Sequence, residues 1–201
     1  MTPLLAISQL IDRFNNSIGK LIGWLVLAAV LISAGNAIVR KAFSIGSNSM
    51  LEIQWYLFAG VFMLGAGYAF LRNVHVRIDF VSSKLSKRTN TIIDILGIVI
   101  FLIPLCLILI NLSWPLFYGA WKSGEMSTNA GGLIRWPVLI LIPLGFSLLL
   151  MQAFSELIKR FAFLKGLIPE PFSVESTKSD EELLAEELAA EAAKKNTAGA
   201  Q

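Results

Sequence analysis

Four polar residues that could carry chemistry follow directly after a long uncharged segment. Arg72, His75, Arg77 and Asp79 lie within eight positions, and His75 is the only histidine in the chain. One interpretation places them at the cytoplasmic end of a membrane helix, where each cation near anionic head groups contributes roughly 1 kcal/mol to binding. The other uses their alternation with apolar residues, which is typical of a segment extended or flat along the interface. We prefer the first for any single residue, because basic residues at helix ends are common in membrane proteins.

The sequence offers little for catalysis or for cofactor binding. A single histidine cannot supply paired haem ligands, and His75 with Asp79 lacks the further ligands that a zinc site needs. Cys106 is the only cysteine and lies deep in an apolar run, which excludes an internal disulfide and disfavours thiol catalysis. No phosphate-binding glycine pattern is present. We therefore predict that the chain is not an enzyme and binds no cofactor of its own.

The composition identifies the environment in which these residues must be positioned. Hydrophobic residues make up 55% of the chain and charged residues 15%, and the mean hydropathy is +0.67, far above that of a soluble domain. Four uncharged runs are each long enough to cross the ~30 Å hydrocarbon layer, which takes about 20 helical residues. They are residues 21–39, 53–71, 95–121 and 136–155. We predict an all-α membrane protein with four transmembrane helices, of which the third is kinked by Pro104 and Pro115, which also mark its exit.

The segments that flank the four-span domain, 21–165, differ in character. At the N-terminus, apolar residues recur at spacings of three and four, which predicts that 1–20 form an amphipathic helix in the membrane interface. These residues are Leu4, Ile7, Ile11, Phe14, Ile18 and Leu21. A simple extension of the first span is the alternative. The tail, 166–201, is acidic and is expected in the cytoplasm, where a solvated helix and disorder are equal alternatives.

Basic residues are distributed unequally between the two sides of the predicted membrane domain. Outside the acidic tail, ten Lys and Arg residues fall on the side of the termini, whereas four, Arg40, Lys41, Lys122 and Arg135, fall on the other side. Loops rich in Lys and Arg stay in the cytoplasm. Both termini are therefore predicted to be cytoplasmic.

The four runs contain no charged residue, which argues against a transport site in this chain. Proton relays and ion sites normally use charged or histidine side chains inside the membrane, where each charge costs at least ~2.5 kcal/mol. Small residues recur at four-residue spacing, at Ala29 and Ser33 and again at Gly65 and Ala69. Such spacing lets helices approach closely, either within this chain or with a partner. The residues alone predict a catalytically silent membrane subunit, with a self-assembling small transporter or channel as the alternative.

Several motifs, in order along the chain, resemble the small membrane subunit (DctQ-like) of tripartite ATP-independent periplasmic (TRAP) transporters. The motif residues are Arg40 after the first span, Glu52, Gln54 and Trp55 in LEIQWYLF, Gly65, and Arg72, His75, Arg77 and Asp79 in RNVHVRID. A later segment, GEMSTNAGGLIRWPVLILIPLGF, is similar to the branch associated with mannitol, chloroaromatic and 2-oxo acid systems. The resemblance covers about 21–165.

This resemblance implies a bacterial inner-membrane scaffold that supports a much larger permease subunit (DctM-like). That partner would carry the substrate and sodium sites, and a periplasmic substrate-binding protein would deliver an organic acid to it. The motif residues from Arg40 to Asp79 would contact the partner or the membrane interface. Anionic lipids are expected at the basic helix ends, and no nucleic-acid partner is expected.

Overall fold

The computed structural model describes residues 2–44, 46–73 and 85–168, and within these ranges the chain is almost entirely helical. The helices are α1 (Thr2–Phe43), α2 (Asn48–Leu71), α4 (Lys87–Gly97), the π-helical turn η1 (Ile98–Leu102), α5 (Ile103–Ser123), α6 (Trp136–Leu139) and α7 (Leu141–Leu164). Four helical stretches in these ranges are long and apolar enough to cross a membrane. The predicted all-α architecture with four spans is confirmed. His75, Arg77, Asp79 and the acidic tail from 169 onward lie outside the described residues.

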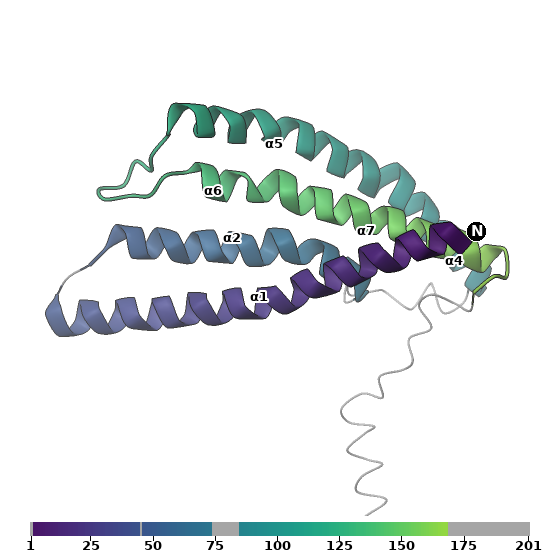
Figure 1. Ribbon diagram of the computed structural model, residues 1–201, viewed down its shortest axis with the longest axis horizontal. Helices are drawn as coiled ribbons and strands as arrows, with labels where there is room; N and C mark the ends of the chain where they lie inside the picture. The colour runs from purple at the N-terminus through teal and green to yellow at the C-terminus, as the bar shows by residue number, and fades with distance from the viewer. Residues whose placement is uncertain (1, 45, 74–84, 169–201) are drawn as a thin grey trace, which may run out of the picture.

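The four long helices lie side by side as a bundle with two different ends (Figure 1). One end, called here the N-terminal end, holds the N-terminus, α4 and the last turns of α7. The other, the loop end, holds the connection from α1 to α2 and the loop from α5 to α6. Helix α7 packs against α1, α2 and α5, so it is the helix around which the others are arranged.

Helix α1 is much longer than a membrane span. Its 42 residues extend about 63 Å at 1.5 Å per residue, twice the ~30 Å hydrocarbon layer. The helix runs without a break from the predicted amphipathic segment into the first span. This continuity is what the alternative prediction, a simple extension of the first span, requires. The placement of 1–20 in the membrane interface stays a prediction.

The N-terminal half of α1 buries two polar residues, whereas several apolar residues of its predicted stripe are exposed. Ser8 and Asn15 are 1% and 0% exposed, whereas Leu4, Ile7 and Phe14 of the predicted apolar stripe are about half exposed. This is the reverse of a helix on a soluble protein. It fits a helix whose outer surface meets lipid or another membrane protein, where apolar exposure carries no penalty.

The third span runs through α4, η1 and α5 as one helical stretch with a local widening. The π-helical turn η1 ends at Leu102, two residues before Pro104, which has no backbone N–H to donate and so interrupts the hydrogen bonds of the preceding turn. Pro115 lies inside α5, and the helix continues to Ser123. The prediction that prolines mark the exit is therefore wrong for Pro115. The helix ends at Gly124, which adopts the left-handed conformation that glycine tolerates best.

Glycines allow the closest helix contacts in the bundle. A Cβ added at Gly145 of α7 would lie 2.5 Å from the carbonyl oxygen of Met63 in α2. A Cβ added at Gly67 of α2 would lie 2.8 Å from Asn15 Oδ1 in α1 and 3.2 Å from the backbone oxygen of Leu148 in α7. The backbones of α2 and α7 therefore come close where glycine removes the side chain, and Gly67 also makes room for the Asn15 side chain of α1.

Candidate functional site

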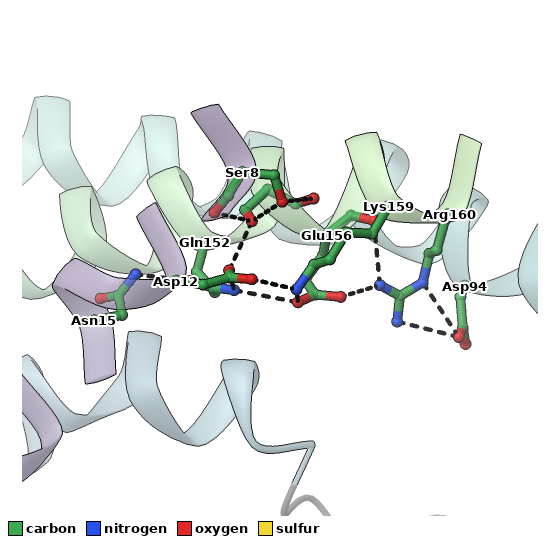
Figure 2. Close-up of polar contacts among 9 residues, drawn as sticks. Ser8, Asp12, Asn15, Asp94, Gln152, Glu156, Lys159 and Arg160 are labelled. Atoms are coloured by element: carbon green, nitrogen blue, oxygen red, sulfur yellow. Dashed lines mark hydrogen bonds and ion pairs between the residues drawn. The ribbon is translucent and has the colours of Figure 1, made fainter. Parts of the chain in front are cut away.

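A buried cluster of polar side chains joins α1, α4 and α7 at the N-terminal end of the bundle (Figure 2). We call it the α1–α7 polar cluster. Its members are Ser8, Asp12, Asn15, Asp94, Gln152, Ser155, Glu156, Lys159 and Arg160. The contacts between α1 and α7 join residues about 140 positions apart, so they fix tertiary structure and not local structure.

Gln152 connects the two sides of this cluster. Its Nε2 donates to Asp12 Oδ1 at 2.9 Å and to Glu156 Oε1 at 3.1 Å, and its Oε1 accepts from Asn15 Nδ2 at 2.7 Å. The side chain is fully buried and uses its carbonyl and both amide protons. Ser155 adds a hydroxyl bond to Asp12 Oδ1 at 2.8 Å. The amide therefore determines the spacing between α1 and α7.

Two cations, Lys159 and Arg160, lie among the three carboxylates of the cluster, and every carboxylate is paired with at least one of them. Glu156 is fully buried and accepts from Arg160 Nη1 at 2.6 Å, and its other oxygen contacts Lys159. Lys159 also lies 3.1 Å from Asp12 Oδ2, and Arg160 lies 3.2 Å from Asp94 Oδ2. Buried charges are tolerated when their desolvation is offset by such partners. The ion pairs therefore link α7 to α1 on one side and to α4 on the other.

One buried atom in the cluster lacks a hydrogen-bond partner in the described part of the chain. Asn15 Oδ1 is buried without such a partner, while its amide nitrogen donates to Gln152. The oxygen faces Gly67, where a methyl group would be too close. Gly67 and Asn15 are thus a matched pair between α2 and α1.

Glu52 forms a second polar site at the loop end. This side chain is 4% exposed and accepts hydrogen bonds from Asn129 Nδ2 at 2.8 Å, from the Leu133 backbone N–H at 2.6 Å and from the Ser127 hydroxyl. All three donors belong to the loop between α5 and α6. Three donors on one carboxylate hold this loop against α2, and hydrogen bonds from Asn48, Ser49 and Tyr56 to its backbone carbonyls add to the attachment. We call this the Glu52 loop anchor.

The motif residues of the sequence analysis occupy several different places. Arg40 is exposed in the last turn of α1, and Trp55 is 67% exposed on α2. Gln54 and Gly65 are half-buried on α2. Only Glu52 among the motif residues in the described ranges is buried. The structure therefore does not gather these residues into one site.

Arg72 caps the end of α2 at the N-terminal end of the bundle. Its Nη2 donates to Asn16 Oδ1 of α1 at 2.8 Å, and its guanidinium lies 5.4 Å from the centre of the Tyr68 ring. This side chain remains exposed to the surroundings. Arg72 therefore links α2 to α1 within the chain. Its companions His75, Arg77 and Asp79 lie outside the described residues.

The α1–α7 polar cluster was not predicted, although the sequence contains two signals for it. Ser8, Asp12 and Asn15 are spaced by four and three positions, so they form a polar stripe that runs beside the apolar one on the same helix. Glu156, Lys159 and Arg160 follow the fourth uncharged run at the i, i+3 and i+4 spacing of ion pairs on a helix. A matching pair of polar stripes predicts helix pairing, provided that both helices reach the same depth.

The chemistry of these two sites is that of structural support. In the ranges that the structure describes, no group of three or more His, Cys, Asp or Glu residues could hold a metal ion. The carboxylates of the α1–α7 polar cluster are each within bonding distance of Lys159 or Arg160. The α1–α7 polar cluster holds α1, α4 and α7 together at the N-terminal end, and the Glu52 loop anchor holds the loop between α5 and α6 at the loop end.

Four long apolar helices, joined by buried polar contacts near each end, define a multi-pass all-α membrane protein. A family model described as "Tripartite ATP-independent periplasmic transporters, DctQ component" matches residues 29–163. Because this match covers most of the chain, the chain belongs to the DctQ family. It is the small membrane subunit of a TRAP transporter, and the family implies a large DctM subunit and a substrate-binding protein as partners. A search of curated proteins and a search of solved structures find no match.

Proposed function

We propose that this subunit is a scaffold that moves no solute itself and supports the large permease subunit of a sodium-coupled importer of an organic acid. The observation that carries the proposal is the use of the buried charges. Glu52, Glu156 and Arg160 are the buried charged residues of the described ranges, and each is bonded within the chain. Charges committed to internal bonds are not available to bind an ion or a substrate. The sodium and substrate sites are accordingly proposed for the partner.

We propose that the N-terminal end of the bundle faces the cytoplasm of a bacterial cell. Eight of the basic residues in the described ranges belong to that end: Arg13, Lys20, Arg72, Lys87, Arg88, Lys159, Arg160 and Lys165. The loop end has four, Arg40, Lys41, Lys122 and Arg135. The excess of cations supports a cytoplasmic position and contact with anionic lipids. The substrate class we propose, an organic acid such as a 2-oxo acid, rests on the resemblance of the segment 124–146 to the branch associated with mannitol, chloroaromatic and 2-oxo acid systems.

Reconstitution in liposomes tests the scaffold proposal. The purified subunit alone should give no uptake of labelled 2-oxo acids above that of empty liposomes. Addition of the large subunit, the binding protein and an inward sodium gradient should produce uptake, and collapse of the gradient should abolish it. Gradient-dependent uptake by the isolated small subunit would refute the proposal in favour of a self-sufficient transporter.

A further inference from the structure

An apolar groove lies between α1 and α2 on the surface of the bundle, toward the loop end. Residues 26–33 of α1 and 54–61 of α2 line it, with Trp55 and Phe58 among its aromatic side chains. Both of these are more than 60% exposed. A second hollow, lined by Asn36 of α1 and Met50 of α2, lies nearer the connection between the two helices. This part of the molecule therefore presents a concave surface to whatever surrounds it.

Polar groups without partners face this otherwise apolar groove. Ser33 of α1 and Gln54 of α2 both line it, and neither has a hydrogen bond to another residue in the described ranges. Asn36 in the neighbouring hollow is in the same situation. Acyl chains offer no hydrogen bonds to such groups, whereas a neighbouring helix with polar side chains does. The polar groups thus favour protein over lipid as the occupant.

The membrane-crossing part of α1 has room for such a neighbour. No residue of its most apolar stretch is buried within the chain, in contrast to a third of the corresponding stretch of the fourth span. Ala29 and Ser33, one turn apart, form the α1 side of the groove. Small residues at this spacing let a second helix backbone come close. The groove therefore has the shape and the chemistry of a helix-packing site.

We propose that this groove binds a transmembrane helix of the large permease subunit, and that Gln54 and Ser33 form hydrogen bonds with that helix. The inference rests on the proposed function, because it takes the large subunit as the partner. It adds the surface that is used, which neither the family match nor the internal polar sites specify. The exposed rings of Trp55 and Phe58 pack along the sides of the bound helix.

The test replaces the amide of Gln54 while keeping its size. Gln54→Leu should weaken binding of the purified large subunit to the tagged small subunit in detergent by about 3- to 30-fold, the range for one hydrogen bond between membrane helices. The variant should keep the wild-type melting temperature, since no bond within the described chain is lost. Asn111→Leu makes the same kind of change on exposed α5, away from the groove, and should leave the affinity unchanged.

A second variant fills the groove directly. Ala29→Trp should reduce binding more strongly than Gln54→Leu, while Gly119→Trp on the open surface of α5 should not. Wild-type affinity in both groove variants would overturn the inference and leave lipid as the occupant. An equal loss in the α5 controls would also overturn it. If the wild-type subunit fails to bind the large subunit, the proposed function itself fails, which separates the two results.

Discussion

Glu52 and Glu156 are buried carboxylates at opposite ends of the bundle, and each is stabilised by different chemistry. Glu52 accepts from neutral donors of one loop, whereas Glu156 contacts the cations Lys159 and Arg160 on its own helix. Hydrogen bonds to an ionised acceptor are stronger than those between neutral groups. At the residue scale, Glu52 therefore stabilises the loop between α5 and α6, and Glu156 stabilises the helix interface at the N-terminal end.

Glu52→Gln should loosen the loop between α5 and α6. In this variant the side-chain NH₂ replaces one carboxylate oxygen and points at the N–H donor of Asn129 or of Leu133. The donors then lack an acceptor, and an unsatisfied buried polar group costs about 1–3 kcal/mol. We expect a lower melting temperature in detergent and faster proteolysis within residues 125–135. Glu125→Gln serves as the matched control, because its ion pair with Arg135 is nearly half exposed and contributes about 1 kcal/mol or less. Equal effects of the two variants would contradict the loop anchor.

Glu156→Leu should destabilise the subunit strongly. Arg160, which is 4% exposed, loses the shorter of its two ion pairs and keeps the one with Asp94 at 3.2 Å, and breaking a buried pair costs up to about 3–5 kcal/mol. The double variant Glu156→Leu/Arg160→Met removes both charges and should recover much of the stability, since apolar replacement of a buried pair is often nearly neutral. Thermal unfolding in detergent measures both. A double variant less stable than the single one would show that Arg160 acts mainly through Asp94.

At the element scale, α1 and α7 pair through polar faces and α2 and α7 pair through glycine. Ser8 and Ser155 meet with their hydroxyl oxygens 2.7 Å apart, and Gly145 lets the α7 backbone approach Met63. Hydrophobic attraction between helices is absent in lipid, so close packing and hydrogen bonds must supply the association. Helices α1 and α7 associate through hydrogen bonds, whereas α2 and α7 associate through close backbone packing.

Gly145→Ala should disrupt the contact between α2 and α7. The added methyl group would meet the backbone of Met63, which cannot rotate away as a side chain would. Overpacking of this kind costs about 1–3 kcal/mol. Gly119→Ala is the control, because nothing lies within 4 Å of its added Cβ and alanine favours the helix. Melting temperatures in detergent should fall for the first variant and stay equal or rise for the second.

At the scale of the whole molecule, the two ends of the bundle must face opposite sides of the membrane. Ser47 and Thr128 belong to the loop end and Leu85 to the N-terminal end, and all three are exposed. With the termini in the cytoplasm, a membrane-impermeant maleimide added to whole cells with a permeable outer membrane should label Ser47→Cys and Thr128→Cys but not Leu85→Cys. The native Cys106 is 0% exposed and serves as an internal blank. Labelling at Leu85→Cys alone would invert the topology.

Much of the architecture could be predicted because span length is a property of the chain itself. The four uncharged runs lie within the four spans, and the motif order indicated the family that the match to 29–163 confirms. The internal sites could not be found in the same way. Glu52 was assigned to a partner or the interface, a role that stays a prediction, and its donors lie at least 75 positions away. The apolar residues of the N-terminal segment favour a helix placed by its apolar stripe, and only the pairing with α7 shows that Ser8 and Asn15 face inward.

The sequence by itself determined that the chain crosses a membrane and how many times. An apolar run either matches the hydrocarbon thickness or does not, and this needs no neighbour. Only the tertiary structure decided which side of each helix faces inward. In a lipid bilayer, apolar side chains are stable on the outer surface of a bundle and do not force a helix to turn them inward. The orientation of α1 therefore depends on its contacts with Gln152, Ser155 and Gly67. Those partners meet α1 only once the helices have been placed side by side.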